Sequence, residues 1–86
     1  MTGSDETLQG LVSFYPNPAK NILYIERPAN ERKLSMVMID AAGRELHRYD
    51  AVEVFQQVDL SMLIPGVYTI IMRSGERTAS WKLVKN

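Results

Sequence analysis

The stretch Tyr15-Pro16-Asn17-Pro18-Ala19, near the start of the chain, separates two short apolar segments. Each proline fixes its own φ, and the residue before each proline is pushed into an extended conformation. The side chain of Asn17 can hydrogen-bond the local backbone as an Asx turn. The stretch therefore predicts a stiff corner where the first strand of a β-domain ends and the second begins.

Beyond this corner, the apolar residues fall in short runs separated by turn signals about every 8–12 residues, which is typical of a β-sandwich or barrel. The runs predict strands at residues 11–15, 22–26, 33–39, 44–49, 54–60, 67–73 and 78–84. Little of the chain remains for helices, and residues 31–36 are the one stretch where a helical turn is considered. The sequence therefore predicts an all-β domain of about seven strands.

Glycines and alternating apolar residues orient these strands. Gly43 and Gly75 are expected to supply the positive φ that closes two hairpins. Alternation places one set of side chains toward the core: Leu34, Met36, Met38, Val58, Leu60, Leu63, Tyr68, Ile70 and Met72. Residues 37–39 and 67–72 are apolar on both faces, which indicates central strands, whereas the polar run 44–49 indicates an edge.

The composition limits the class of protein. The chain has 86 residues, ten acidic and ten basic side chains, and no cysteine. One small domain of this length buries roughly 60% of its unfolded surface and has no disulfide or thiolate site to supplement the core. A net charge of zero argues against nucleic acid as the main partner, because phosphate binding needs a local cationic excess.

The domain boundaries follow from the same composition. Residues 1–10 are polar and predict a linker rather than a signal peptide, which leaves residues 11–86 as the folded domain. No apolar run approaches the roughly 20 residues that span a bilayer, so membrane insertion is not expected.

No residue pattern predicts catalysis, a metal site or a cofactor. The single histidine, His47, lies in a charged strand, and a zinc site needs three or four ligands. No serine lies in a G-x-S-x-G context, and no calcium-loop spacing occurs. Acids at strand ends, such as Asp40 and Asp59, are expected to hydrogen-bond turns. A glycosidase carboxylate pair stays open on spacing alone, although a domain this small predicts no cleft.

Two groups of residues allow alternative interpretations. The aromatic residues considered for a sugar platform are Phe14, Tyr24, Tyr49, Phe55, Tyr68 and Trp81. Core packing is favoured for them, and Trp81 is the least settled. The terminal stretch Lys82-Leu83-Val84-Lys85 is either an edge strand protected by lysines or a basic strand end offered to a receptor.

Five pieces of the sequence, in this order, resemble the type A C-terminal sorting domain of the type IX (Por) secretion system of Bacteroidetes. The pieces are Tyr15-Pro16-Asn17-Pro18-Ala19, the strand at 22–25, the hairpin at 39–45, residues 58–68 and the end at 82–85. The resemblance covers residues 11–86, and it is specific because the pieces keep their order. Ile64 before Pro65 and Asn86 after the final lysine are small departures from the pattern.

The resemblance implies a seven-stranded, immunoglobulin-like antiparallel β-sandwich at the C-terminus of a cargo protein. It also implies export: the cargo reaches the periplasm with a cleavable signal, and the domain then directs it through the outer-membrane translocon. A surface sortase usually removes such a domain, here by a cut upstream of Leu11, in or before residues 4–10. The cargo then lies at the cell surface, with attachment to lipopolysaccharide as one outcome, or outside the cell.

The resemblance also favours the terminal residues as the recognition site. The hypothesis is that Lys82, Leu83, Val84 and Lys85 form the receptor surface, through edge pairing of the backbone and contacts of the lysine heads. The strand Gly66-Val67-Tyr68 is expected to hold them in place, with an unusual φ at Gly66 and Tyr68 in the core. An open edge of this kind also predicts a homodimer of the isolated domain. The remaining motif residues, expected to be structural, are Pro16, Asn17, Pro18, Gly43, Asp59 and Leu60.

The alternative function is an accessory immunoglobulin-like module that binds carbohydrate or protein. It predicts Trp81, Tyr24 or Tyr49 exposed on one flat face. The sorting-domain interpretation instead predicts that most aromatic side chains are buried and that the notable exposed surface follows the terminal strand.

Overall fold

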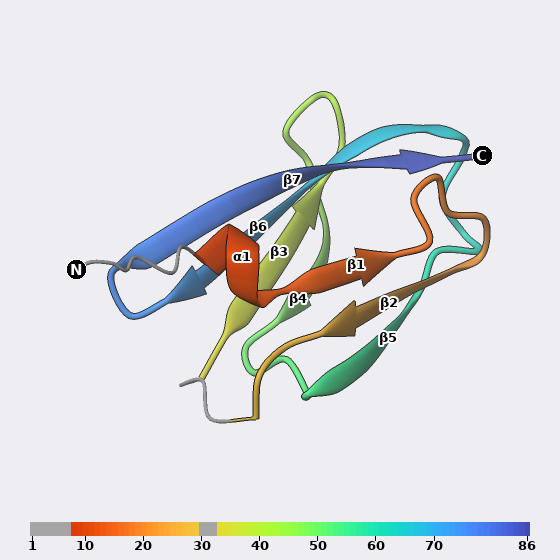
Figure 1. Cartoon of the computed structure of the whole chain (residues 1–86). Helices are drawn as coiled ribbons and strands as arrows, with labels where there is room; N and C mark the ends of the chain where they lie inside the picture. Colours follow the sequence, from red (N-terminus) through yellow and green to blue (C-terminus); the bar gives the residue numbers. More distant parts are fainter. Residues whose placement is uncertain (1–7, 30–32) are drawn as a thin grey trace.

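The computed structural model describes residues 8–29 and 33–86, which form seven β-strands and one short helix (Figure 1). In chain order the elements are α1 (Leu8–Leu11), β1 (Ser13–Tyr15), β2 (Ile22–Glu26), β3 (Ser35–Ile39), β4 (Glu45–Tyr49), β5 (Phe55–Asp59), β6 (Gly66–Ser74) and β7 (Arg77–Lys85). The two longest strands, β6 and β7, form a continuous hairpin at the end of the chain.

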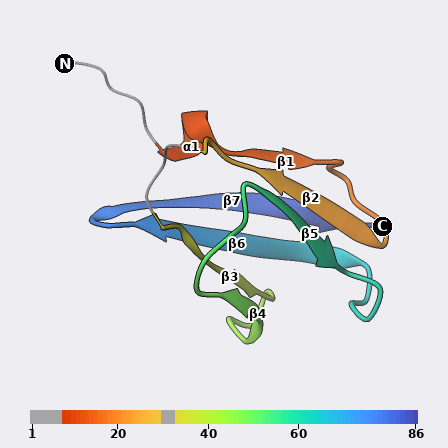
Figure 2. The ribbon, with the colours of Figure 1, turned by 90° about the horizontal axis from the view of Figure 1, so that it is seen from below.

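The strands form two sheets that lie one over the other (Figure 2). One sheet has the order β1-β2-β5 and the other the order β4-β3-β6-β7, and neighbouring strands in each sheet are antiparallel. In constant-type immunoglobulin domains the fourth strand joins the first sheet. Here β4 pairs with β3 instead. The predicted all-β, immunoglobulin-like sandwich is confirmed.

Alternation along the strands builds one core between the sheets. The side chains buried almost completely are Leu23, Ile25, Leu34, Met36, Met38, Val52, Val58, Leu60, Ile70, Met72 and Leu83. The core faces predicted for the third and sixth strands are therefore confirmed, and Leu63 packs partly buried against the core. The central positions of β3 and β6 and the edge position of β4 are confirmed as well.

The N-terminal part differs from the prediction. The helix α1 crosses the predicted boundary between linker and domain, so β1 begins at Ser13 rather than at residue 11. This helix has a single turn and packs against β7, so its stability comes from a tertiary contact that local sequence does not reveal. The turn considered at 31–36 falls partly on residues outside the described ones, and Ser35 and Met36 belong to β3.

The hairpin between β3 and β4 shows how the turns are stabilised. Gly43 has a φ of 85°, as expected, and its N–H donates to the main-chain oxygen of Asp40 at 3.0 Å. The carboxylate of Asp40 accepts hydrogen bonds from the N–H groups of Ala42 and Arg44 at 2.9 and 2.8 Å. These bonds, that from Arg44 first, lower the pKa of Asp40 below its ordinary value of 3.8.

Replacing Asp40 by asparagine is expected to lower the melting temperature at neutral pH and to matter less in acid. A carboxyl whose pKa is lowered by folding stabilises the fold above its unfolded pKa, and this stability is lost as the pH falls through the folded pKa. The difference in melting temperature between Asp40→Asn and the parent should therefore close as the pH falls below 3.8. Thermal unfolding followed by circular dichroism over a pH series measures it. A difference in melting temperature that does not change with pH would show that the charge of Asp40 does not contribute to the stability of the fold.

Candidate functional site

The predicted recognition residues lie on two paired strands, β6 and β7, which run side by side in blue in Figure 1. The opposed pairs are Gly66 with Lys85, Val67 with Val84, Tyr68 with Leu83, and Thr69 with Lys82. We call residues 66–69 and 82–85 the terminal strand pair. The strand Gly66-Val67-Tyr68 therefore lies beside residues 82–85, as expected.

The side chains of the last strand alternate between the core and the outside. Leu83 and Lys85 point inward and are 1% and 7% exposed, whereas Lys82 is exposed and Val84 is 36% exposed. A lysine tolerates this burial when its alkyl stem packs and its head reaches an oxygen. The Nζ of Lys85 donates to the main-chain oxygen of Asn86 at 3.3 Å. Of the two predicted lysines, Lys82 is therefore the one whose head lies on the outer surface.

The neighbouring strand contributes one surface residue and one structural residue. Val67 points outward, is 49% exposed and lies opposite Val84. Tyr68 is buried, and its hydroxyl donates to the main-chain oxygen of Ile64, four residues upstream. This is the arrangement of the tyrosine corner of immunoglobulin-like domains. The unusual φ expected at Gly66 is wrong: its φ lies outside the left-handed region, and a Cβ there would meet open space.

The Pro-Asn-Pro corner reaches across to the last strand. The Nδ2 of Asn17 donates to the main-chain oxygen of Lys82 at 3.1 Å, and its Oδ1 accepts from the N–H of Val84 at 3.1 Å. The side-chain amide of Asn17 therefore occupies the place of a peptide group in a neighbouring strand. The Asx turn expected at Asn17 is not what its side chain makes. Its partners lie 65 and 67 residues away, a contact that no local sequence signal indicates.

The backbone of Ala19 continues this pairing. Its N–H donates to the main-chain oxygen of Val84 at 2.8 Å, and its oxygen accepts from the N–H of Asn86 at 2.8 Å. Ala19 is thus in a parallel bridge with Lys85. Residues 17–19 fill the open edge of β7 next to residues 82–86. A partner strand could pair with that edge only by displacing residues 17–19, which makes the side chains of the terminal strand pair the accessible part of the site.

Three aromatic side chains lie on the outer face of the three-stranded sheet. Tyr15, Tyr24 and Phe55 occupy outward positions of β1, β2 and β5, and Phe55 is 53% exposed, so core packing is the wrong interpretation for Phe55. The ring centroids of Tyr24 are 5.7 Å from those of Tyr15 and 5.5 Å from those of Phe55, with interplanar angles of 31° and 21°. Phe55 is thus stacked on Tyr24 and Tyr15 is tilted against Tyr24, so the three rings do not form a flat platform for a sugar.

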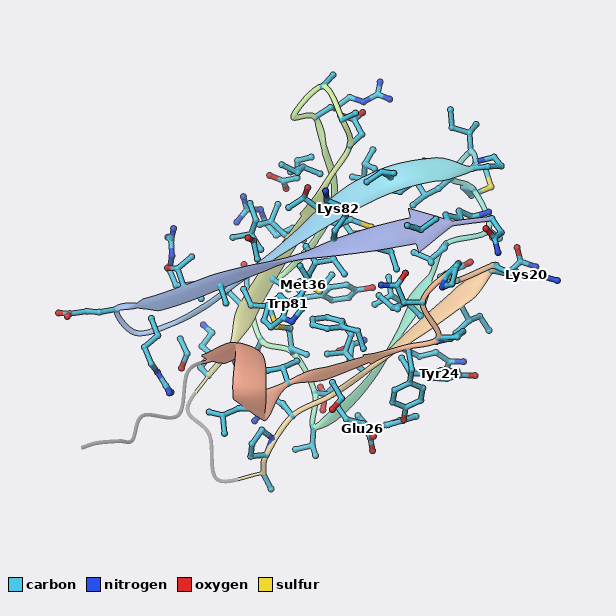
Figure 3. The ribbon with its side chains drawn as sticks, turned by 45° about the horizontal axis from the view of Figure 1, so that its top comes forward. Lys20, Tyr24, Glu26, Met36, Trp81 and Lys82 are labelled. Atoms are coloured by element: carbon cyan, nitrogen blue, oxygen red, sulfur yellow. The ribbon has the colours of Figure 1, made fainter. Side chains whose placement is uncertain are left out.

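The other aromatic residues considered for sugar binding are buried or packed against the core. Trp81 packs against the core, and its ring centroid lies 4.6 Å from that of Phe14. Figure 3 shows Trp81 beside Met36 between the sheets, while Tyr24 points away from them. Tyr49 is also partly buried against the core. These positions favour core packing, as expected, and weaken the carbohydrate-binding alternative.

Asp59, like Asp40, uses its carboxylate to stabilise a turn. The carboxylate of Asp59 accepts from the N–H of Ser61 at 2.9 Å, which lowers the pKa of Asp59 and closes the turn after β5. Within residues 8–29 and 33–86, no group of three or more His, Cys, Asp and Glu side chains is placed to hold a metal ion. In the same part of the chain, no helix has the length and apolar character to cross a membrane.

An immunoglobulin-like sandwich whose terminal strand pair presents Val67, Lys82 and Val84 on its outer face has the features of a recognition module. A family model described as "Secretion system C-terminal sorting domain" matches residues 13–86. No curated protein sequence matches the chain. The chain belongs to this family, the type IX secretion C-terminal sorting domains. Sorting signal domains of this family are not catalytic. The chain is thus a sorting signal that interacts with the type IX machinery and directs secretion across the outer membrane.

Proposed function

We propose that the domain is the detachable address of a larger exported cargo, which the translocon recognises at the terminal strand pair. The observation that carries the proposal is the fixed alternation of the last strand. Leu83 and Lys85 anchor it to the core, while Lys82 and Val84 face outward beside Val67. Folding in the periplasm therefore creates a surface that an unfolded cargo tail does not present.

The same proposal includes removal of the domain by a surface sortase. The cut that the family resemblance implies lies in or before residues 4–10. Residues 8–10 belong to α1, which packs against β7. Proteolysis favours exposed segments outside packed elements. We therefore place the cut on the N-terminal side of Leu8.

The test is export of a reporter. Residues 4–86 are fused to the C-terminus of a reporter with a signal peptide, in a host that has the type IX system. The intact fusion is expected at the cell surface or in the medium. A fusion that lacks residues 82–86 is expected to stay in the periplasm, because it loses both the outward side chains and the buried Leu83.

Two controls accompany the test: one shows that export depends on the translocon, and the other separates recognition from folding. The first is the intact fusion in a strain without the translocon, where the reporter should remain periplasmic. The second is circular dichroism of the shortened domain, which shows whether the sandwich survives the deletion. Full surface yield without residues 82–86 would contradict recognition at the terminal strand pair.

A further inference from the structure

The outer face of the four-stranded sheet carries an apolar strip. Opposed residues on antiparallel strands share a face, so the register sets Val37 opposite Ile71 and Val67 opposite Val84. Thr69 lies between these two pairs on β6, opposite Ile39 of β3 and Lys82 of β7. The members are Val37, Ile39, Val67, Ile71 and Val84. Val67 and Val84 are exposed, the others are half-buried, and no described segment packs over this face.

Basic side chains border the strip. Arg48 lies opposite Val37, and its guanidinium is held by both carboxylate oxygens of Glu45 at 2.8 Å. Arg73 and Lys82 point outward from β6 and β7. Within the described part of the chain, neither Arg73 nor Lys82 forms an ion pair. Both cations are therefore available to a carboxylate on a partner.

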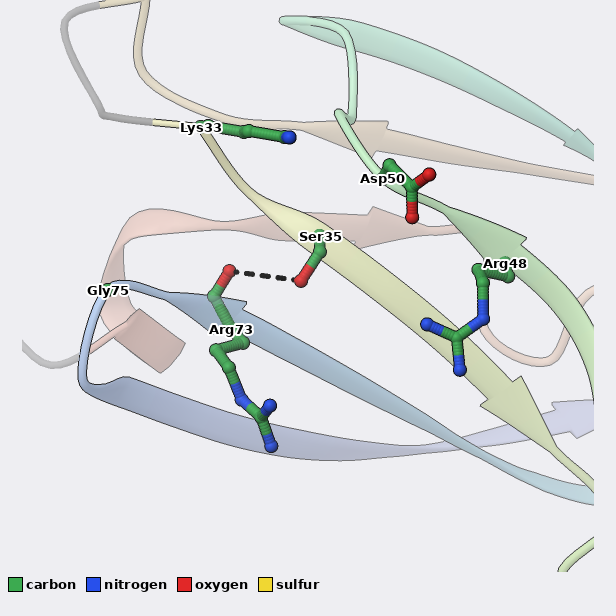
Figure 4. A pocket seen from close by; sticks show the side chains of 6 residues that line it. All are labelled: Lys33, Ser35, Arg48, Asp50, Arg73 and Gly75. Carbon is green, nitrogen blue, oxygen red and sulfur yellow. Dashed lines mark hydrogen bonds between the residues drawn. The ribbon is translucent and has the colours of Figure 1, made fainter.

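One end of the strip is hollowed. Figure 4 shows this shallow hollow, which is lined by Lys33, Ser35, Arg48, Asp50, Arg73 and Gly75. Three of these side chains are basic and one is acidic. The hydroxyl of Ser35 donates to the main-chain oxygen of Arg73 at 3.5 Å, which links the two strands beneath the hollow. An acidic side chain of a partner fits this lining by charge.

The opposite outer face has the reverse character. Among the described residues of the three-stranded sheet, the outward positions carry Glu26 and Asp59 and no basic side chain. The charges of the two outer faces therefore have opposite signs, although the net charge of the whole chain is zero. This separation orients the domain toward a partner whose docking surface is acidic.

We propose that the secretion machinery reads the outer face of the four-stranded sheet, and that its docking protein presents an apolar surface bordered by carboxylates. The proposal rests on the proposed function and extends its site from the terminal strand pair across β6 and β3. Face-on docking agrees with an edge already filled by residues 17–19. A protein is favoured over a membrane because the strip consists of Val and Ile and lacks the Trp, Phe and Leu side chains typical of membrane anchors.

The experiment uses the reporter fusion with two variants of this outer face. Val67→Glu places a carboxylate in the strip, and the double variant Arg73→Glu, Lys82→Glu reverses its border. Each is expected to lower the rate of surface display at least about tenfold, since like charges brought together in an interface cost several kcal/mol. Thermal unfolding of the purified domains confirms that the sandwich remains folded.

The matched controls place the same changes elsewhere. Phe55→Glu adds a carboxylate at an exposed apolar position of the other sheet, and Lys20→Glu reverses an exposed lysine of the corner. Both should be displayed at the parental rate. Folded outer-face variants that match the controls would overturn the docking face, including recognition at the terminal strand pair, while leaving the sorting function itself intact. Surface display of the unsubstituted fusion in a strain without the type IX translocon would contradict both the sorting function and the docking face.

Vesicles distinguish a lipid from a protein partner. The purified domain is mixed with vesicles of phosphatidylglycerol and with lipopolysaccharide, and sedimentation measures binding. No binding is expected. Binding that Arg73→Glu, Lys82→Glu removes would show that the face reads an anionic lipid, which overturns the protein partner.

Discussion

The Leu83→Ala variant is expected to leave much of the domain unfolded at room temperature. Leu83 is 1% exposed in the core, and replacing a buried leucine by alanine costs about 2–5 kcal/mol. A domain of this size without disulfides has a total stability of only a few kcal/mol. The loss therefore approaches the whole free energy of unfolding, and the reporter fusion should lose surface display along with its fold.

Val84→Ala is the matched control on the same strand. Val84 is 36% exposed, so its truncation leaves no closed cavity and should cost well under the Leu83 change. Urea unfolding measures both, with the fluorescence of Trp81, the single tryptophan, as the probe. Equal unfolding midpoints for the two variants would contradict the alternation of core and surface along the last strand.

That alternation is the part of the fold that the sequence predicts well. Period-two patterns at Met36 and Met38 and at Ile70 and Met72 identify the core faces, because one side of each central strand must be buried. The hairpin at Gly43 is equally local, since its positive φ depends on the residue itself. Seven runs of this kind leave few all-β architectures. The resemblance to the sorting family then selects the immunoglobulin-like sandwich.

The site was harder to predict because its geometry is not local. Lys85 looks like a second surface lysine, but alternation beside Leu83 turns it inward. Phe55 looks like a core aromatic, yet its strand places it outside, where stacking on Tyr24 covers one ring face. The outer strip likewise needs the register of three strands. Alternation decides the direction of Lys85 and Phe55 once the core face of each strand is known, whereas the strip also depends on strand order and pairing between distant segments, which single-sequence patterns do not contain.

The contact of Asn17 with the last strand is the clearest non-local feature, and its loss is expected to free the end of β7. Asn17→Ala removes two hydrogen bonds worth about 0.5–1.5 kcal/mol each. The N–H of Val84 then has no partner at the edge, so its hydrogen exchange should speed up much more than that of core amides such as Ile70. Amide exchange followed by NMR makes the comparison directly.

Asn17→Asp separates the two hydrogen bonds. An aspartate oxygen can still accept from the N–H of Val84, but it cannot donate to the main-chain oxygen of Lys82. Protection of the Val84 N–H from exchange should therefore lie between that of the parent and that of Asn17→Ala.

Analytical ultracentrifugation at two concentrations adds a second measure, because an unpaired strand edge favours pairing with another copy. We expect self-association to rise in Asn17→Ala. Unchanged exchange at Val84 and unchanged association together would mean that residues 17–19 do not close this edge in solution.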